Sequence, residues 1–234
     1  MIFILIQLIL PVTAHSADWT SFYRAHFGLK DPYQKLVGNT GEGFDALYGV
    51  RNFRVVLDGI QYRGGANNSF NRTAPRSNMN PLPAEGLQRL CEQGFGLAIY
   101  LYAENFEKSE HEFRCNSIRG PNTLRYIQVS PLANEAEAFK ILKHIRDTLE
   151  DYRHGPIYTH CWNGWHASGY ISALSLRQFC GWSVEQAVDY WDRNTDGVNT
   201  EPAYEKVRIR IRNFVPAKEL QISDALRASV CPVL

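Results

Sequence analysis

A cysteine stands between two contrasting hydrophobic patterns. The run Ile157–His160 is rich in β-branched and aromatic residues and follows Pro156, which predicts a buried strand. From Ser168 to Phe179 the apolar residues recur at a helical spacing. A loop that leaves a strand and enters a helix presents backbone N–H groups, and together with the helix dipole these form an anion pocket. Cys161 lies at the rim of this predicted pocket, where a positive field would favour the nucleophilic thiolate.

The loop resembles the phosphate-binding loop of cysteine-dependent protein tyrosine and dual-specificity phosphatases. The family pattern is His-Cys, two residues, Gly, two residues, Arg, and then Ser or Thr. The matching residues are His160, Cys161, Gly164, Ser168 and Gly169. The chain departs from the pattern at Ala167, which occupies the position of the family's Arg. Because that Arg holds phosphate through two parallel hydrogen bonds, this loop has lost its strongest cation.

The resemblance implies a reaction in which a thiolate attacks phosphorus and water then cleaves the phosphocysteine. Cys161 would be the nucleophile, His160 would set the geometry of the loop, and the Ser168 hydroxyl would ease departure of the sulfur. Backbone N–H groups would bind the phosphate oxygens. The predicted substrate is a phosphorylated small molecule or a phosphoprotein. The predicted substrate-binding residues are Trp162, Asn163, Gly164, Trp165, His166 and Ala167.

The missing cation needs a replacement if the loop is to turn over a substrate. Its loss should cost on the order of 10² to 10⁴ in rate. His166 is one candidate, since an ordinary histidine is a cation below about pH 6.5. Further candidates are Arg63, Arg72, Arg76 and Arg119.

The general acid is also displaced. The family places an Asp on the loop at positions 130–134, which here reads Ser-Pro-Leu-Ala-Asn. Glu135 is the candidate acid because it and Glu137 are the nearest carboxylates, although stabilisation of a helix N-terminus explains both. The later residues Asp189, Asp192 and Asp196 have no positional support.

Three functions are therefore open. The first is an exported cysteine phosphatase with weak or atypical activity. The second is a pseudophosphatase that binds a phosphorylated or anionic ligand without turnover. The third is a thiol-dependent hydrolase of another class, with His166 or His160 as the partner of Cys161. Trp162 and Trp165 either form an aromatic wall for a planar substrate or simply pack.

Composition places the chain among ordinary globular proteins. It has 234 residues and a net charge of +1, which argues against a dedicated nucleic-acid binder. The length suits one domain, predicted at residues 18–234. No Cys-x-x-Cys or His-x-x-x-His cluster occurs, so neither a metal site nor another cofactor is expected.

The N-terminus predicts export. Residues 2–10 are almost wholly apolar and Pro11 ends the run, with small residues at signal-peptidase spacing directly after it. We therefore predict a signal peptide at residues 1–17 and a periplasmic or secreted location. The run is too short for a stable membrane span. A buried N-terminal strand is the alternative.

Cysteine usage is compatible with export. Setting aside Cys161 leaves four of the five cysteines, which allow three pairings. Disulfides such as Cys91–Cys115 and Cys180–Cys231 are one interpretation, and four buried thiols are an equal one.

The wider pattern predicts an α/β fold with a central, mostly parallel sheet flanked by helices, protein-tyrosine-phosphatase-like. The expected strands are 53–57, 60–63, 97–102, 124–129 and 157–160. The expected helices are 84–93, 135–152, a helix from 168, one from 183 and a final one at 204–214. Residues 207–212 alternate like a strand, but the family resemblance implies a helix there.

Overall fold

The computed structural model describes residues 13–29, 31–66 and 81–232. The apolar run 2–10 lies outside these residues, so the signal peptide stays a prediction. The candidate cations Arg72 and Arg76 also lie outside them. In the described ranges, no helix combines the length and the apolar character that a membrane span needs.

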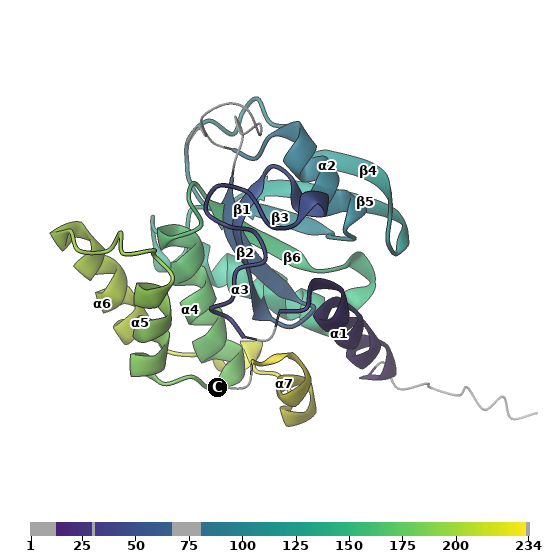
Figure 1. Ribbon diagram of the computed structural model, residues 1–234. Helices are drawn as coiled ribbons and strands as arrows, with labels where there is room; N and C mark the ends of the chain where they lie inside the picture. The colour runs from purple at the N-terminus through teal and green to yellow at the C-terminus, as the bar shows by residue number, and fades with distance from the viewer. Residues whose placement is uncertain (1–12, 30, 67–80, 233–234) are drawn as a thin grey trace, which may run out of the picture.

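A six-stranded sheet forms the centre of the molecule (Figure 1). The strand order is β1-β2-β6-β3-β5-β4; the inner strands run parallel, and the outer strands β1 and β4 pair antiparallel with their neighbours. The predicted mostly parallel sheet flanked by helices is thereby confirmed. The strands are β1 (Val50–Leu57), β2 (Gln61–Ala66), β3 (Leu97–Tyr100), β4 (Glu112–Ser117), β5 (Gly120–Gln128) and β6 (Ile157–Cys161).

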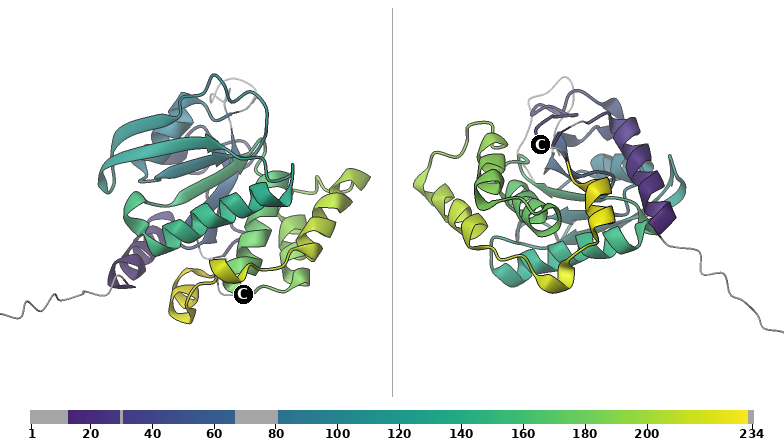
Figure 2. Two further views of the ribbon diagram at one scale, coloured as in Figure 1. Left: turned by 180° about the vertical axis from the view of Figure 1, so that it is seen from behind. Right: turned by 90° about the horizontal axis from the view of Figure 1, so that it is seen from below.

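Helices cover both faces of the sheet (Figure 2). α3 and α4 pack on one face, with α5 and α6 outside α4, while α1 and α2 lie on the opposite face. The α-helices of the described residues are α1 (Thr13–Phe27), α2 (Ala84–Glu92), α3 (Glu135–Glu150), α4 (His166–Cys180), α5 (Val184–Arg193), α6 (Glu205–Asn213) and α7 (Asp224–Val230). The short 3₁₀ helices are η1 (Asp45–Leu47), η2 (Tyr152–His154), η3 (Pro202–Tyr204) and η4 (Lys218–Leu220).

The two faces of the sheet carry different kinds of side chain, because successive side chains on a strand point in opposite directions. On β2, Tyr62 packs against Phe27, Phe53 and Phe95 under α1 and α2. Its neighbour Arg63 points to the other face, where it meets α4 and α5. The core is therefore apolar and aromatic on the α1–α2 face and carries charge on the α4 face.

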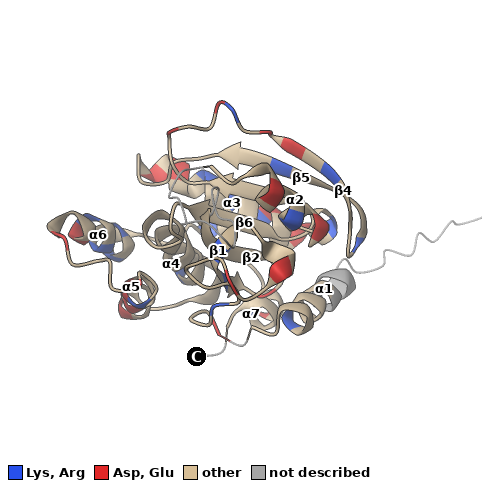
Figure 3. Ribbon diagram, turned by 45° about the horizontal axis from the view of Figure 1, so that its top comes forward, with Lys and Arg blue, Asp and Glu red and all other residues tan. Residues whose placement is uncertain are grey.

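Local sequence signals account for most of the elements. The Asp58-Gly59 turn joins β1 and β2 as an antiparallel hairpin. Asn134 caps α3 by accepting from the Glu137 N–H, and Ser183 forms a capping box with Gln186 at α5. The ambiguous segment 207–212 belongs to helix α6, as the resemblance implied. The charged residues of α6 are mostly cations (Figure 3): Glu205 at its first position is followed by Lys206, Arg208, Arg210 and Arg212.

Three local features differ from what the sequence pattern indicates. Phe139 recurs at a helical spacing with Leu142, Ile145 and Leu149, but it is among the exposed large hydrophobic residues. The buried face instead centres on Ala138, Ile141 and Leu142, about 100° around the helix from Phe139. Strand β4 and helix α7 were not predicted, since the sequence of β4 is mostly polar and exposed.

Four cysteines form disulfides. Cys91–Cys115 joins α2 to β4, and Cys180–Cys231 joins the end of α4 to the residue that follows α7. The alternative of four buried thiols is therefore wrong. Cys161 is the free cysteine of the chain, and it is buried.

Candidate active site

Cys161 ends β6 in the middle of the sheet, between β2 and β3, at the carboxyl ends of parallel strands. In open α/β sheets this is where ligands bind. The chain then turns through residues 162–165 and enters α4 at His166. The predicted strand, loop and helix are confirmed, and the helix begins two residues earlier than expected.

The first loop carbonyls are held by the β1–β2 hairpin. Arg51 donates from Nε and Nη2 to the Trp162 carbonyl, at 3.1 and 2.9 Å. Asn52 donates from Nδ2 to the Asn163 carbonyl at 2.7 Å. The Ala66 N–H also donates to the Trp162 carbonyl, at 3.0 Å.

The next carbonyls are held by Arg63. Its Nη2 donates to the Gly164 carbonyl and, at 3.1 Å, to the Trp165 carbonyl. Four successive loop carbonyls, from Trp162 to Trp165, thus accept hydrogen bonds from side chains of one hairpin.

This arrangement decides where the loop amides point. In a trans peptide the N–H points opposite to the C=O of the same unit. Because the carbonyls of residues 162–165 face the hairpin, the N–H groups of Asn163 to His166 face away from it. No hydrogen bond among the described residues takes these N–H groups, and α4 has no side-chain cap at Trp165. Loop and helix start together supply donors for an anion.

Glycines let the loop lie directly on β2. Gly164 has φ of +79°, in the left-handed region that favours glycine. A Cβ on Gly164 would come within 2.6 Å of the Gly64 carbonyl carbon, and one on Gly65 within 2.5 Å of the Asn163 carbonyl carbon. Backbone therefore packs on backbone, which fixes the height of the loop above the sheet.

The sulfur of Cys161 is 3.4 Å from the hydroxyl of Ser168, in the first turn of α4. The same hydroxyl is 3.4 Å from Nη2 of Arg63. Both residues that flank the hydroxyl are almost fully buried, with Cys161 at 2% and Arg63 at 0% exposure. The predicted Cys161–Ser168 pair therefore lies together, and a buried cation lies next to it.

His160 lies on the other face of the sheet. The Leu82 N–H donates to the Tyr126 hydroxyl at 3.1 Å, so this hydroxyl uses its own hydrogen on His160 Nε2, at 2.8 Å. His160 Nδ1–H then donates to the Cys161 carbonyl at 3.2 Å. Burial lowers the pKa of His160 to about 3, so the ring is neutral. It positions the backbone of Cys161 and does not contact the sulfur.

The Ala167 side chain is fully buried. His166 does not replace the missing cation. Its Nε2 donates to the Val198 carbonyl at 2.5 Å, and its ring stacks on Tyr204 at 4.1 Å. Burial lowers the pKa of His166, so the ring is neutral at physiological pH. Neither histidine is placed as a base beside the sulfur, which disfavours a thiol–histidine hydrolase.

Three arginines of the hairpin are buried beneath the loop, with exposures of 0% for Arg51, 1% for Arg54 and 0% for Arg63. Burial, together with the nearby charge of Arg63, lowers the pKa of Arg54 to about 10, so it remains a cation at neutral pH. Arg63 was among the predicted candidates, whereas Arg51 and Arg54 were missed. The available signal was the presence of Arg51, Asn52 and Arg54 in a strand whose other residues are apolar. Arg119 lies elsewhere, over the ring of Trp19.

Among the described residues, no carboxylate contacts Cys161 or Ser168 as a general acid would. Glu135 lines a separate cavity of about 340 Å³ with Tyr170, Arg210 and Phe214, and has no described contact with the loop. The structure therefore does not support its predicted catalytic role. Asp189 and Asp192 pair with arginines of α5 and α6.

Asp196 does contact the loop, as an acceptor. Its carboxylate accepts from Trp165 Nε1 at 2.9 Å and from Lys35 Nζ at 2.7 Å. Burial opposes ionisation, but these hydrogen bonds outweigh it and lower the pKa of Asp196. The group is therefore ionised and serves to hold the loop.

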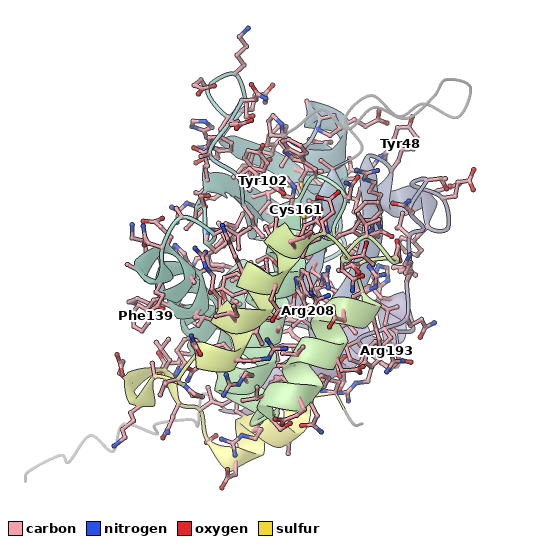
Figure 4. All side chains as sticks on the ribbon, turned by 90° about the vertical axis from the view of Figure 1, so that its left-hand side faces the viewer. Tyr48, Tyr102, Phe139, Cys161, Arg193 and Arg208 are labelled. Carbon is pink, nitrogen blue, oxygen red and sulfur yellow. A yellow bond between two sulfur atoms is a disulfide. The ribbon has the colours of Figure 1, made fainter. Side chains whose placement is uncertain are left out.

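Aromatic rings form one wall of the site. Trp162 stacks on Tyr102 at 4.8 Å and donates from Nε1 to the Tyr100 hydroxyl at 3.4 Å. Tyr102 and Cys161 lie at the same end of the sheet (Figure 4). Burial, and secondarily the charge of a Cys161 thiolate, raises the pKa of Tyr102, so its hydroxyl stays protonated. Both tryptophans are thus held in place by protein partners.

No protein-family model matches the chain, and no curated protein matches it. Solved structures with a similar arrangement include three phosphatase-related chains. The core catalytic domain of the PP-IP phosphatase SIW14 from S. cerevisiae, in complex with citrate, is 19% identical with a TM-score of 0.47 over 73% of this chain and 88% of that chain. TpbA of P. aeruginosa is 15% identical with a TM-score of 0.44 over 75% and 90%. Tk-PTP in the active form is 15% identical with a TM-score of 0.44 over 70% and 97%.

At identities of 15 to 19% and TM-scores below 0.5, these likenesses carry no argument about the activity of this chain.

Proposed function

We propose that this protein hydrolyses a phosphate monoester through a phosphocysteine intermediate, with Cys161 as the nucleophile. The observation that carries the proposal is the orientation of the loop: four carbonyls are tied to the hairpin, and the amides of the same peptides are left for an anion beside the one free thiol. Such fixed donors stabilise the charge that develops on phosphate oxygens in the transition state.

The steps follow from the groups at the loop. The Cys161 thiolate attacks phosphorus, the S–P bond forms, and the bond to the leaving oxygen breaks. Water then attacks phosphorus, releases inorganic phosphate and returns the thiolate, to which the Ser168 hydroxyl is close enough to donate. Without an Arg at Ala167, we expect a slower rate than a loop with the full clamp would give.

Phosphate release from p-nitrophenyl phosphate tests this proposal. Wild-type protein should release phosphate, and Cys161→Ser should abolish the release because an alkoxide is not available at neutral pH. Acid quench followed by mass spectrometry should find one added phosphate on the peptide that contains Cys161. Equal rates for wild type and Cys161→Ser would refute the nucleophilic role.

A second candidate function is favoured by one observation, the buried Ala167 in place of the clamp. A pseudophosphatase would keep the amide cradle and bind a phosphorylated ligand without turnover. Ala167→Arg separates the two candidates. A disarmed phosphatase should gain activity with this change. If the hairpin arginines already organise the loop, activity should fall, because a large cation must enter a space that is closed and already positive.

Export remains part of the proposal. The two disulfides support it, since such bonds persist in oxidising compartments. N-terminal sequencing of protein collected outside the cytoplasm should give a first residue close to Asp18. A mature chain that still begins at residue 1 would refute a cleaved signal peptide.

A further inference from the structure

The guanidinium of Arg63 is a buried charge that has no carboxylate partner among the described residues. Its hydrogen-bond partners among the described residues are two carbonyls and two hydroxyls: those of Gly164, Trp165, Ser168 and Tyr190. A buried charge that lacks an opposite charge is costly to fold. Two groups in this network can become anions: the Tyr190 phenol, which contacts Arg63 directly, and the Cys161 thiol, which lies one hydroxyl further on. A thiol ordinarily loses its proton more readily than a phenol does.

The direction of these hydrogen bonds follows from the donors available. A guanidinium has N–H donors and no acceptor, so Ser168 Oγ must accept from Arg63. A serine hydroxyl carries one hydrogen, and a thiolate can only accept, so when Cys161 is ionised the hydrogen bond between them runs from Ser168 Oγ to Cys161 Sγ. Other serines of α4 behave differently: Ser172 and Ser175 donate to carbonyls four residues earlier. The equivalent carbonyl for Ser168 is that of Gly164, which accepts from Arg63, and no hydrogen bond from Ser168 Oγ to it is found among the described residues.

We propose that Arg63 is a positioning residue that fixes Ser168 as the hydrogen-bond donor to Cys161 and provides the buried counter-charge of the thiolate. Arg63 thus takes over, from inside the sheet, the electrostatic part of the role that the Ala167 position has lost. This inference rests on the proposed function, because it concerns the same thiolate.

Alkylation of Cys161 by iodoacetamide, followed as a function of pH, tests the proposal without any turnover. The full chain with both disulfides formed offers one thiol, so the reaction reports on Cys161 alone. Arg63→Gln and Ser168→Ala should each raise the midpoint of the profile by about one pH unit. Because the two groups act in series, the double variant should shift the midpoint no further than the larger single change.

Two further variants separate charge from structure. Arg63→Lys keeps a buried cation and should bring the midpoint back towards the wild-type value. Arg54→Gln is the matched control, since Arg54 is equally buried on the adjacent strand but contacts the Asn52 carbonyl and Asp196 in place of Ser168. It should move the midpoint by less than half the shift of Arg63→Gln.

Clear results would overturn the proposal. One is a folded Arg63→Gln protein, by near-ultraviolet circular dichroism, whose midpoint equals that of wild type. Another is full additivity of the Arg63 and Ser168 effects. If Arg63→Gln does not fold, an unchanged midpoint in Ser168→Ala is sufficient to reject the idea. Failure of the proposed phosphatase function would appear separately, as absent phosphate release from a wild-type protein whose alkylation profile still responds to both changes.

Discussion

The two faces of the sheet approach Cys161 with opposite chemistry. From the α1–α2 face, a neutral chain runs from the Leu82 N–H through Tyr126 to His160 and ends on the Cys161 carbonyl. From the α4 face, a cationic network runs from Arg63 through Ser168 to the Cys161 sulfur. The neutral chain fixes the backbone of Cys161, and the cationic network contacts its sulfur. Positioning and electrostatics, which a loop arginine would combine in one side chain, are divided here between two faces.

Breaking the cationic side at Arg51 should give the largest effect. Arg51→Met leaves the Trp162 carbonyl and the Asn163 side chain without their charged donor, so the loop loses its fixed orientation. We expect inorganic phosphate to inhibit the hydrolysis of p-nitrophenyl phosphate about 10- to 100-fold more weakly. The free energy of unfolding should fall by about 1 to 3 kcal/mol. Arg119→Met is the control, because Arg119 lies over Trp19, away from the loop. Equal phosphate inhibition of both variants and wild type would contradict this view of the hairpin.

The neutral chain on the α1–α2 face should make the free energy of unfolding depend on pH, through His160. The pKa of His160 is lowered from 6.5 to about 3 by burial, so between these values the unfolded chain binds a proton that the folded chain does not. The His160 contribution is therefore complete above pH 6.5 and is lost as pH falls, at about 1.4 kcal/mol for each pH unit. Denaturant titrations from pH 7 to 5 should show a slope that is smaller in His160→Gln. A variant with the wild-type slope would place the proton uptake on another group.

A change on the neutral side should affect stability without affecting the thiol. Tyr126→Phe removes the hydroxyl that joins the Leu82 N–H to His160 and leaves both without that partner. We expect a loss of about 1 to 3 kcal/mol in the free energy of unfolding. The alkylation midpoint of Cys161 should stay within a few tenths of a pH unit of wild type. A shift as large as that of Ser168→Ala would remove the distinction between the two faces.

The smallest effect is expected at Glu135. Its carboxylate lies in a cavity with Tyr170 and Arg210 and has no described contact with the loop. Glu135→Gln should change kcat by less than about twofold, because a residue that does not touch the reacting atoms contributes little to general acid catalysis. A loss of a hundredfold, together with loss of the basic limb of the pH profile, would restore Glu135 as the acid.

Sequence patterns could predict the elements that bear the site better than the contacts that tune it. The strand into Cys161, the tight loop and the following helix all have local signatures, and Gly164 adopts the positive φ that its position in the motif required. The roles of Arg51, Arg54 and Asp196 depend on which strands are neighbours and which face each side chain occupies. A charged residue within a strand pattern does not indicate which strand will be its neighbour or which face its side chain will occupy, because tertiary pairing decides both. His166 failed as a cation for the same reason, since a distant carbonyl and ring bury it.

The disulfide pattern has a consequence for how the protein reaches its native state. Any one of five cysteines can be left out of two bridges, and the remaining four still allow three pairings. The native arrangement is the one that spares the thiol on the central strand β6. Oxidation that precedes insertion of β6 into the sheet would consume that thiol in a wrong pair and give a covalently closed but inactive chain. Yield of active protein should therefore depend on a disulfide isomerase, or on a redox buffer that reshuffles early pairs, more than on oxidation itself.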